Sequence, residues 1–174
     1  MSSAGRSGLP VMSTPVIEER PAQPYVAVRG LVTMQTFPQI ADRLGEVFGW
    51  LGAHGAEVAG APFFRYLRID MAGELDIEAG VPVAVPVGGD GDLLAGVLPA
   101  GRYASVKHVG HPDRLIGHTA ALLEWGRAQG LRWDCTESER GELWGCRLEI
   151  MHTDPNVEPD LNRWTTELAF KLAD

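Results

Sequence analysis

The sequence predicts an α+β fold in which two copies of a βαββ unit, related by pseudo-twofold symmetry, form one curved, mainly antiparallel sheet with two helices. Two observations predict this fold. Short segments of the first half recur in the same order in the second half, as internal repeats do. In each half, an extended segment precedes one amphipathic helical stripe, and two further segments have the composition of strands.

The internal repeat is clearest at the end of each expected helix. Residues 48–55 resemble residues 123–130, and their shared Trp, Ala and Gly positions lie 75 residues apart. Connections between repeated elements vary in length more than the elements do, so the offset is expected to drift. The matches outside the helices are Tyr25 with Tyr103, at an offset of 78, and Leu67 with Leu148, at an offset of 81.

The sequence pattern predicts the same succession of elements in both halves. Hydrophobic residues at helical spacing, begun near a proline and ended by a glycine, predict one helix in each half. In the first half, the extended segment is 16–32, the helix is 38–54, and the strands are 63–70 and 81–87. In the second half, the extended segment is 93–109, the helix is 113–129, and the strands are 144–152 and 163–172.

The length of the chain favours one domain. Its 174 residues suit a single domain over residues 16–174, with repeat halves of about 16–90 and 91–174. Residues 1–15 are rich in Ser, Gly and Pro and lack the apolar core of a secretory signal, so we expect a disordered tail and a cytoplasmic protein. No apolar run is long enough to cross a bilayer, so no membrane partner is expected.

Charge and motifs exclude several classes of function. A formal net charge of −8 repels phosphate backbones, which argues against direct nucleic-acid binding. The histidines have no carboxylate or thiol at ligand spacing, and the glycine-rich segment 88–91 lacks the lysine of a phosphate loop. No nucleophile elbow is present. The sequence therefore predicts neither a metal nor a cofactor.

Strand alternation divides the residues of the closing strands between two faces. We expect the apolar set, including Leu148, to lie under the helices. Glu149 and Glu167 should then both point to the opposite face, together with Phe64 and Tyr66. A carboxylate in such a place attracts a cation, and aromatic faces strengthen that attraction. The alternative is that each glutamate is a solvent-facing charge on an open sheet.

Three segments of the second half resemble the GyrI-like family of bacterial proteins, also known as AraC-type effector-binding domains. They are 103–112 (YASVKHVGHP), 147–155 (RLEIMHTDP) and 164–168 (WTTEL), and the resemblance extends over about residues 16–172. It implies a duplicated βαββ fold related to the SOUL haem-binding fold, with a ligand cleft along the pseudo-twofold axis. It also implies binding of bulky aromatic drugs, often cationic, by a buried glutamate and surrounding aromatic residues.

The resemblance assigns the buried glutamate to Glu149, with Glu167 as a second acidic candidate. Position 151 is Met where relatives often carry Tyr, so one expected ring is absent. About 15 residues precede the first strand, too few for a helix-turn-helix, so we expect a stand-alone domain without direct DNA control. The expected ligand-binding residues are Glu149, Glu167, Tyr66, Phe64, Trp144, Trp133, Tyr103 and Met151.

The sequence favours binding over catalysis. The expected partners are lipophilic aromatic cations or other bulky aromatic small molecules, and the expected role is drug or toxin sensing or sequestration. The resemblance also implies a first alternative, because some relatives are hydrolases that open cyclopropane-bearing alkylating compounds. Glu149 or Glu167, with Tyr66, would then be the chemical groups. A second, weaker alternative is a protein-interaction modulator such as a gyrase inhibitor. A homodimer is also left open.

Overall fold

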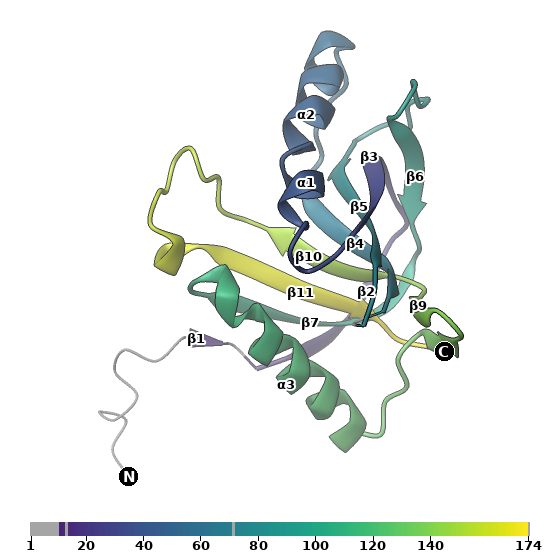
Figure 1. Ribbon diagram of the computed structural model, residues 1–174, viewed down its shortest axis with the longest axis vertical. Helices are drawn as coiled ribbons and strands as arrows, with labels where there is room; N and C mark the ends of the chain where they lie inside the picture. Colours follow the sequence, from purple (N-terminus) through teal and green to yellow (C-terminus); the bar gives the residue numbers. More distant parts are fainter. Residues whose placement is uncertain (1–10, 13, 71, 174) are drawn as a thin grey trace.

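The structure is a computed structural model that describes residues 11–12, 14–70 and 72–173. Most of the tail predicted for residues 1–15 lies outside the described residues, but Val11–Met12 forms a short strand, β1, beside His108 and Val109. The predicted α+β fold is confirmed: Figure 1 shows a curled sheet with the helices on one of its faces. No helix among the described residues is long and apolar enough to cross a membrane.

Strands from both halves join in one sheet, and every strand pair is antiparallel. The first-half strands are β2 (Val16–Arg20), β3 (Gln23–Val32), β4 (Phe63–Ile69) and β5 (Leu75–Pro82). The second-half strands are β6 (Leu94–Leu98), β7 (Gly101–Val109), β8 (Cys135–Ser138), β9 (Gly141–Trp144), β10 (Arg147–Met151) and β11 (Thr165–Lys171). Their order across the sheet is β1-β7-β11-β10-β4-β5-β3-β6, with β2 also on β7 and the β8–β9 hairpin on β4.

The order of the strands is symmetric about the β4–β10 pair. On one side of this pair lie β5 and then β3, and on the other side lie their equivalents, β11 and then β7. The strands that lead into each half are exchanged, because β2 pairs with β7 and β6 pairs with β3. The two halves are thus interlocked, and residues of β4 and β10 lie at the centre of the fold.

Each half contributes helices that cover its own strands. The helices are α1 (Pro38–Ala41), α2 (Leu44–Ala53) and α3 (Leu115–Ala128), with short 3-10 turns η2 (Pro112–Arg114) and η3 (Leu161–Arg163). The helix predicted for 38–54 is broken at residues 42–43, and the helix predicted for 113–129 begins as the 3-10 turn. Trp50 on α2 and Trp125 on α3 occupy equivalent elements. Buried residues of the helices, such as Leu51 of α2 and Leu122 of α3, pack against the sheet.

Several strand boundaries differ from the prediction. The extended segments 16–32 and 93–109 each break into two strands, because Pro21 and Pro99 cannot donate to a ladder. The strand predicted for 81–87 is β5 at 75–82 instead. This strand contains two acidic residues, Asp76 and Glu78, which are unfavourable in a strand. Glu78 is nevertheless buried in the structure, where the Tyr25 hydroxyl donates a hydrogen bond to it. The β8–β9 hairpin was not predicted.

Both faces of the sheet are apolar, and this corrects the predicted orientation of β10. On the helix side, Leu168 and Phe170 of β11 are buried as expected. Leu148, however, lies on the reverse face, in a second core with Tyr103. The register pairs Glu149 with Leu168, so Glu149 lies on the helix side of the sheet. Hydrophobicity alone could not orient β10, because an apolar core exists on either side.

Candidate ligand-binding site

A cavity of about 570 Å³ opens between the start of α1 and α3, above the central strands. Figure 1 shows α1 and α3 on two sides of β10. The helical walls are apolar, and Met34 and Ile116 are exposed on the cavity lining, with 46% and 65% of their surface accessible. Residues that line the cavity include Phe37, Leu115, Ile116, Thr119 and Leu123 from the helical side and Tyr66, Arg147 and Glu149 from the strands.

The carboxylate of Glu149 lies on this cavity in a defined orientation. The Tyr66 hydroxyl on β4 donates a hydrogen bond to Glu149 Oε1 at 3.0 Å. Burial raises the pKa of Glu149, while the Tyr66 hydrogen bond and the Arg147 charge oppose that rise. Burial also raises the pKa of the Tyr66 hydroxyl, so it remains a donor at neutral pH. Glu149 is half-buried and reaches solvent by way of the cavity.

The guanidinium group of Arg147 lies on the same cavity among three aromatic rings. Its central carbon is 4.6 Å from the ring centroid of Phe170, 4.9 Å from that of Trp144 and 5.8 Å from that of Tyr66. Burial lowers the pKa of Arg147, and the Glu149 charge acts in the opposite direction. An arginine with a lowered pKa is still protonated at neutral pH. β10 therefore contributes one anion and one cation to the cavity, two positions apart, and the exposed carboxylate of Asp113 lies on the cavity lining as well.

The other predicted aromatic residues lie behind this cavity or away from it. Phe64 is buried beneath it, with its ring 4.8 Å from that of Phe37. Trp133 and Trp144 pack against Phe170, at centroid distances of 6.0 and 5.6 Å. Trp144 supports the site through its contact with Arg147, and neither tryptophan lines the cavity.

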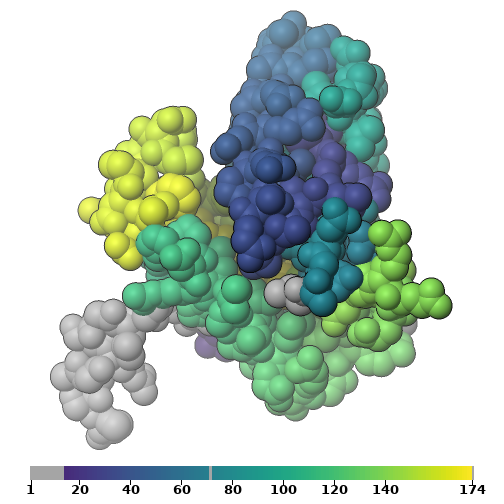
Figure 2. Space-filling view, in the orientation of Figure 1, coloured from purple at the N-terminus to yellow at the C-terminus, as the bar shows by residue number. Residues whose placement is uncertain are grey.

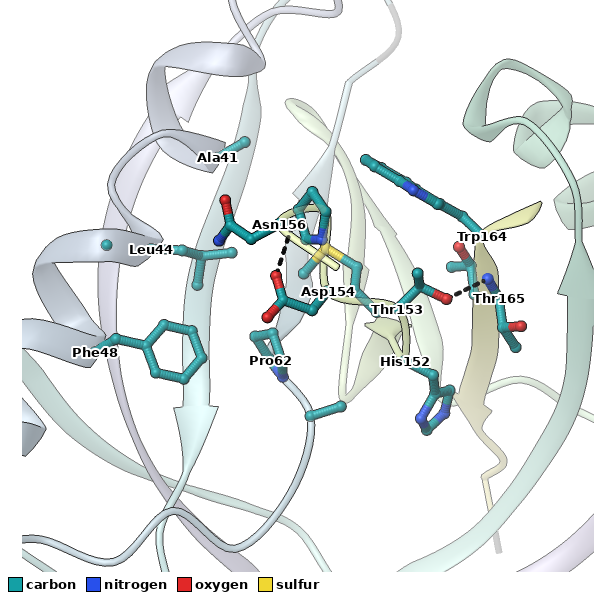
Figure 3. Close-up of a pocket in the computed structure, with 15 residues that line it drawn as sticks. Ala41, Leu44, Phe48, Pro62, His152, Thr153, Asp154, Asn156, Trp164 and Thr165 are labelled. Atoms are coloured by element: carbon teal, nitrogen blue, oxygen red, sulfur yellow. Dashed lines mark hydrogen bonds between the residues drawn. The ribbon is translucent and has the colours of Figure 1, made fainter. Parts of the chain in front are cut away.

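Met151 lines a second cavity, of about 670 Å³, between α1–α2 and the loop that joins β10 to β11. Figure 3 shows Leu44 and Phe48 on one side of it and Trp164 on the other. In Figure 2 the loop and α1–α2 form two lobes with a hollow between them. Since Glu149 and Met151 share one face of β10, the two cavities follow one another along this strand.

Glu167 lies on the reverse face of the sheet, and this corrects the prediction that it joins Glu149. It is buried, pairs across the ladder with Ile150, and accepts hydrogen bonds from Arg20 Nη2 and from His152 Nε2, the latter at 2.7 Å. Tyr103 is on the same face, with the Arg20 guanidinium 5.6 Å from its ring centroid. Both residues border a smaller cavity of about 270 Å³.

Sequence reasoning missed Arg147 and the helical wall of the cavity. An arginine two positions before Glu149 in a strand has the pattern of a surface charge, and only its aromatic neighbours in the fold distinguish it from one. Phe37, next to the expected start of the helix at Pro38, was an available signal. For metal ions, no group of three or more His, Cys, Asp or Glu residues suited to hold one was found within the described parts of the chain.

The GyrI-like small molecule binding domain family matches residues 13–143 of the chain. This protein belongs to the GyrI-like family. The matched residues include β4 with Tyr66 and all of α3, and they end before β10. No curated protein matches this GyrI-like domain in sequence.

Solved structures share the fold of this GyrI-like domain at low sequence identity. The EcmrR C-terminal domain aligns with a TM-score of 0.73 and 18% identity, over 95% of this chain and 99% of that one. SAV2435 bound to tetraphenylphosphonium aligns with a TM-score of 0.58 and 9% identity, over 92% and 94%. A hydrolase from Listeria innocua aligns with a TM-score of 0.61 and 13% identity, over 92% of each chain. In an EcmrR–DNA complex, the matching part is 57% of the EcmrR chain.

Proposed function

We propose that this GyrI-like domain binds bulky aromatic small molecules that carry a positive charge, in the cavity between α1 and α3. The observation that carries the proposal is the Glu149 carboxylate, held by the Tyr66 hydroxyl at 3.0 Å on the floor of an apolar cavity. The cavity volume of about 570 Å³ is within the range of small-molecule sites.

The electrostatics of the site support a cationic group in the ligand. A carboxylate removed from water loses hydration free energy, and its raised pKa reflects that loss. A cation placed beside Glu149 restores a favourable interaction that a neutral ligand of the same shape cannot supply. The apolar walls, including Phe37 and Leu123, favour a ligand with a large aromatic surface. The net charge of −8 also favours cations over nucleic acid as partners.

The relatives support the same class of ligand. SAV2435, which shares the fold, was solved with tetraphenylphosphonium, a bulky aromatic cation. The family is described as a small molecule binding domain. We propose drug or toxin sensing or sequestration as the role of this domain, because its cavity is suited to ligands of this size and charge.

Isothermal titration calorimetry with tetraphenylphosphonium and neutral triphenylphosphine oxide tests the proposal. We expect the cation to bind wild type, and Glu149→Gln to weaken it by about tenfold, the effect of removing one favourable charge interaction of about 1.4 kcal/mol. Glu124→Gln is the control, because it removes the same charge from an exposed position on α3. Equal binding of both compounds, or equal loss in both variants, would contradict the proposal.

Hydrolysis is a second candidate function, favoured by one observation. A carboxyl group with a raised pKa beside a tyrosine hydroxyl can exchange a proton with a reacting molecule. Incubation with a cyclopropane-bearing alkylating compound, followed by mass spectrometry, tests for ring opening. Product formation that is lost in Glu149→Gln would favour the hydrolase over simple binding.

A further inference from the structure

Arg147 gives the cavity a positive charge, and no part of the proposed function uses it. We infer that Arg147 makes this cavity selective for aromatic cations that also carry a carboxylate or a similar anionic acceptor. The inference rests on the proposed function, since it concerns the ligand of the same cavity. It names zwitterionic aromatic molecules as the preferred class.

The aromatic rings around Arg147 already hold a cation, the guanidinium group itself. Phe170, Trp144 and Tyr66 surround the guanidinium at centroid distances of 4.6, 4.9 and 5.8 Å. Cation–π attraction from these rings is therefore used within the protein. A ligand with only a positive charge is attracted by Glu149 but repelled by the neighbouring guanidinium.

The guanidinium also has donors to offer. Other arginines are paired: Arg29 with Asp76, and Arg20 with Glu18 and Glu167. Among the residues that the structure describes, none accepts a hydrogen bond from Arg147 or forms an ion pair with it within 4.0 Å. A guanidinium stacked on aromatic rings keeps its N–H groups at its edge, where a carboxylate can accept two of them.

The spacing of the two charges is set by β10. Arg147 and Glu149 alternate with Leu148 on β10 and share its helix-side face, so their Cα atoms are about 7 Å apart. Both side chains line the same cavity. The hydrogen bond from Tyr66 holds the carboxylate, and the rings hold the guanidinium. The cavity therefore presents a fixed negative and a fixed positive group, which complement a ligand with both charges on one aromatic scaffold.

Rhodamine B and its ethyl ester form a suitable pair of probes. They share one aromatic cation, and at neutral pH only the first carries a carboxylate. Fluorescence anisotropy of each dye, titrated with the full chain, gives the two affinities. We expect wild type to bind rhodamine B at least about fivefold more tightly than the ester, because charge-assisted hydrogen bonds are among the strongest in proteins.

Substitutions of Arg147 should change the ratio of the rhodamine B affinity to the ester affinity in a specific way. Arg147→Met keeps the length of the side chain and removes the charge, so the ester should bind as well as rhodamine B or better. Arg147→Lys keeps the charge but cannot donate two parallel hydrogen bonds to one carboxylate, so it should give an intermediate ratio. Arg29→Met removes an arginine from an exposed ion pair on β3, a strand with no residue on the lining of this cavity, and should keep the wild-type ratio.

The outcomes separate this inference from the proposed function. If neither dye binds wild type, the proposed function fails. If both dyes bind with equal affinity and Glu149→Gln weakens both, the proposed function stands and this inference is wrong. The wild-type ratio requires no variant, so the inference remains testable even if Arg147→Met does not fold. A ratio that persists in a folded Arg147→Met protein would also overturn it.

Discussion

Glu149 and Glu167 lie on adjacent antiparallel strands and point to opposite faces of the sheet. Glu149 is opposite Leu168 in the ladder, and Glu167 is opposite Ile150. Tyr66 holds the first carboxylate on the helix side, and Arg20 and His152 hold the second on the reverse side. The two glutamates therefore do not form one acidic site, and they can be tested separately.

The first prediction is that Glu149 reduces stability at neutral pH. Its pKa is raised in the folded state, so the folded protein binds this proton more tightly than the unfolded chain does. Its contribution to the free energy of unfolding is present below the ordinary pKa of about 4.3 and is lost as pH rises through the folded-state pKa. Glu149→Gln should be more stable than wild type at pH 7, by on the order of 1 kcal/mol, with little difference at pH 4. Urea unfolding at both pH values measures this, and a less stable variant at pH 7 would contradict it.

The second prediction concerns the Tyr66 hydroxyl. Its hydrogen bond lowers the pKa of Glu149, so Tyr66→Phe should raise that pKa further. Affinity for tetraphenylphosphonium is expected to fall as pH falls through the pKa of Glu149, and the midpoint should move to higher pH in the variant. Calorimetric titrations from pH 5 to 8 measure it. Tyr103→Phe is the comparison, because the Tyr103 hydroxyl donates to the Pro99 carbonyl instead. Identical midpoints in wild type and Tyr66→Phe would count against the assigned contact.

The third prediction assigns Glu167 to stability and not to ligand affinity. Its carboxylate is buried and accepts hydrogen bonds from Arg20 and His152. Glu167→Gln should lower the free energy of unfolding by about 1.5–3 kcal/mol, the usual contribution of hydrogen bonds to charged groups. The affinity for tetraphenylphosphonium should stay within about twofold of wild type. Chemical denaturation and calorimetry on the same sample measure both, and a large loss of affinity would place Glu167 in the site after all.

The fourth prediction tests the packing of α3 that forms one wall of the cavity. A Cβ atom at Gly126 would overlap the ring of Trp133, whereas a Cβ atom at Gly117 in the same helix would meet nothing within 4 Å. Gly126→Ala should therefore destabilise the fold by about 1–3 kcal/mol. Gly117→Ala is the matched control and should stabilise it by up to about 1 kcal/mol, because alanine favours helix. Thermal unfolding of both variants measures these changes, and equal shifts of the melting temperature in Gly126→Ala and Gly117→Ala would contradict the prediction.

The sequence predicted the parts of the fold that depend on periodicity. Trp50 and Trp125 marked two equivalent helices, and both are present. Alternation also placed Phe64 and Tyr66 on one face with Glu149, and the hydrogen bond between Tyr66 and Glu149 agrees with that placement.

The register between β10 and β11 could not be predicted from the sequence. The relative faces of Glu149 and Glu167 depend on how β10 pairs with β11, and a shift of one residue exchanges the faces. Residues 152–164 join the two strands, and this connection is too long for the rules of tight hairpin turns to predict the register. Arg147 was missed for a related reason, since its aromatic partners Trp144 and Phe170 become neighbours only in the folded sheet.

The central claim is that the ligand binds beside Glu149, and a crystal structure with tetraphenylphosphonium tests it most directly. We expect density for the cation between α1 and α3, in contact with Phe37 and within reach of the Glu149 carboxylate. Density only in the cavity between Met151 and Trp164, or only on the reverse face beside Glu167, would contradict it.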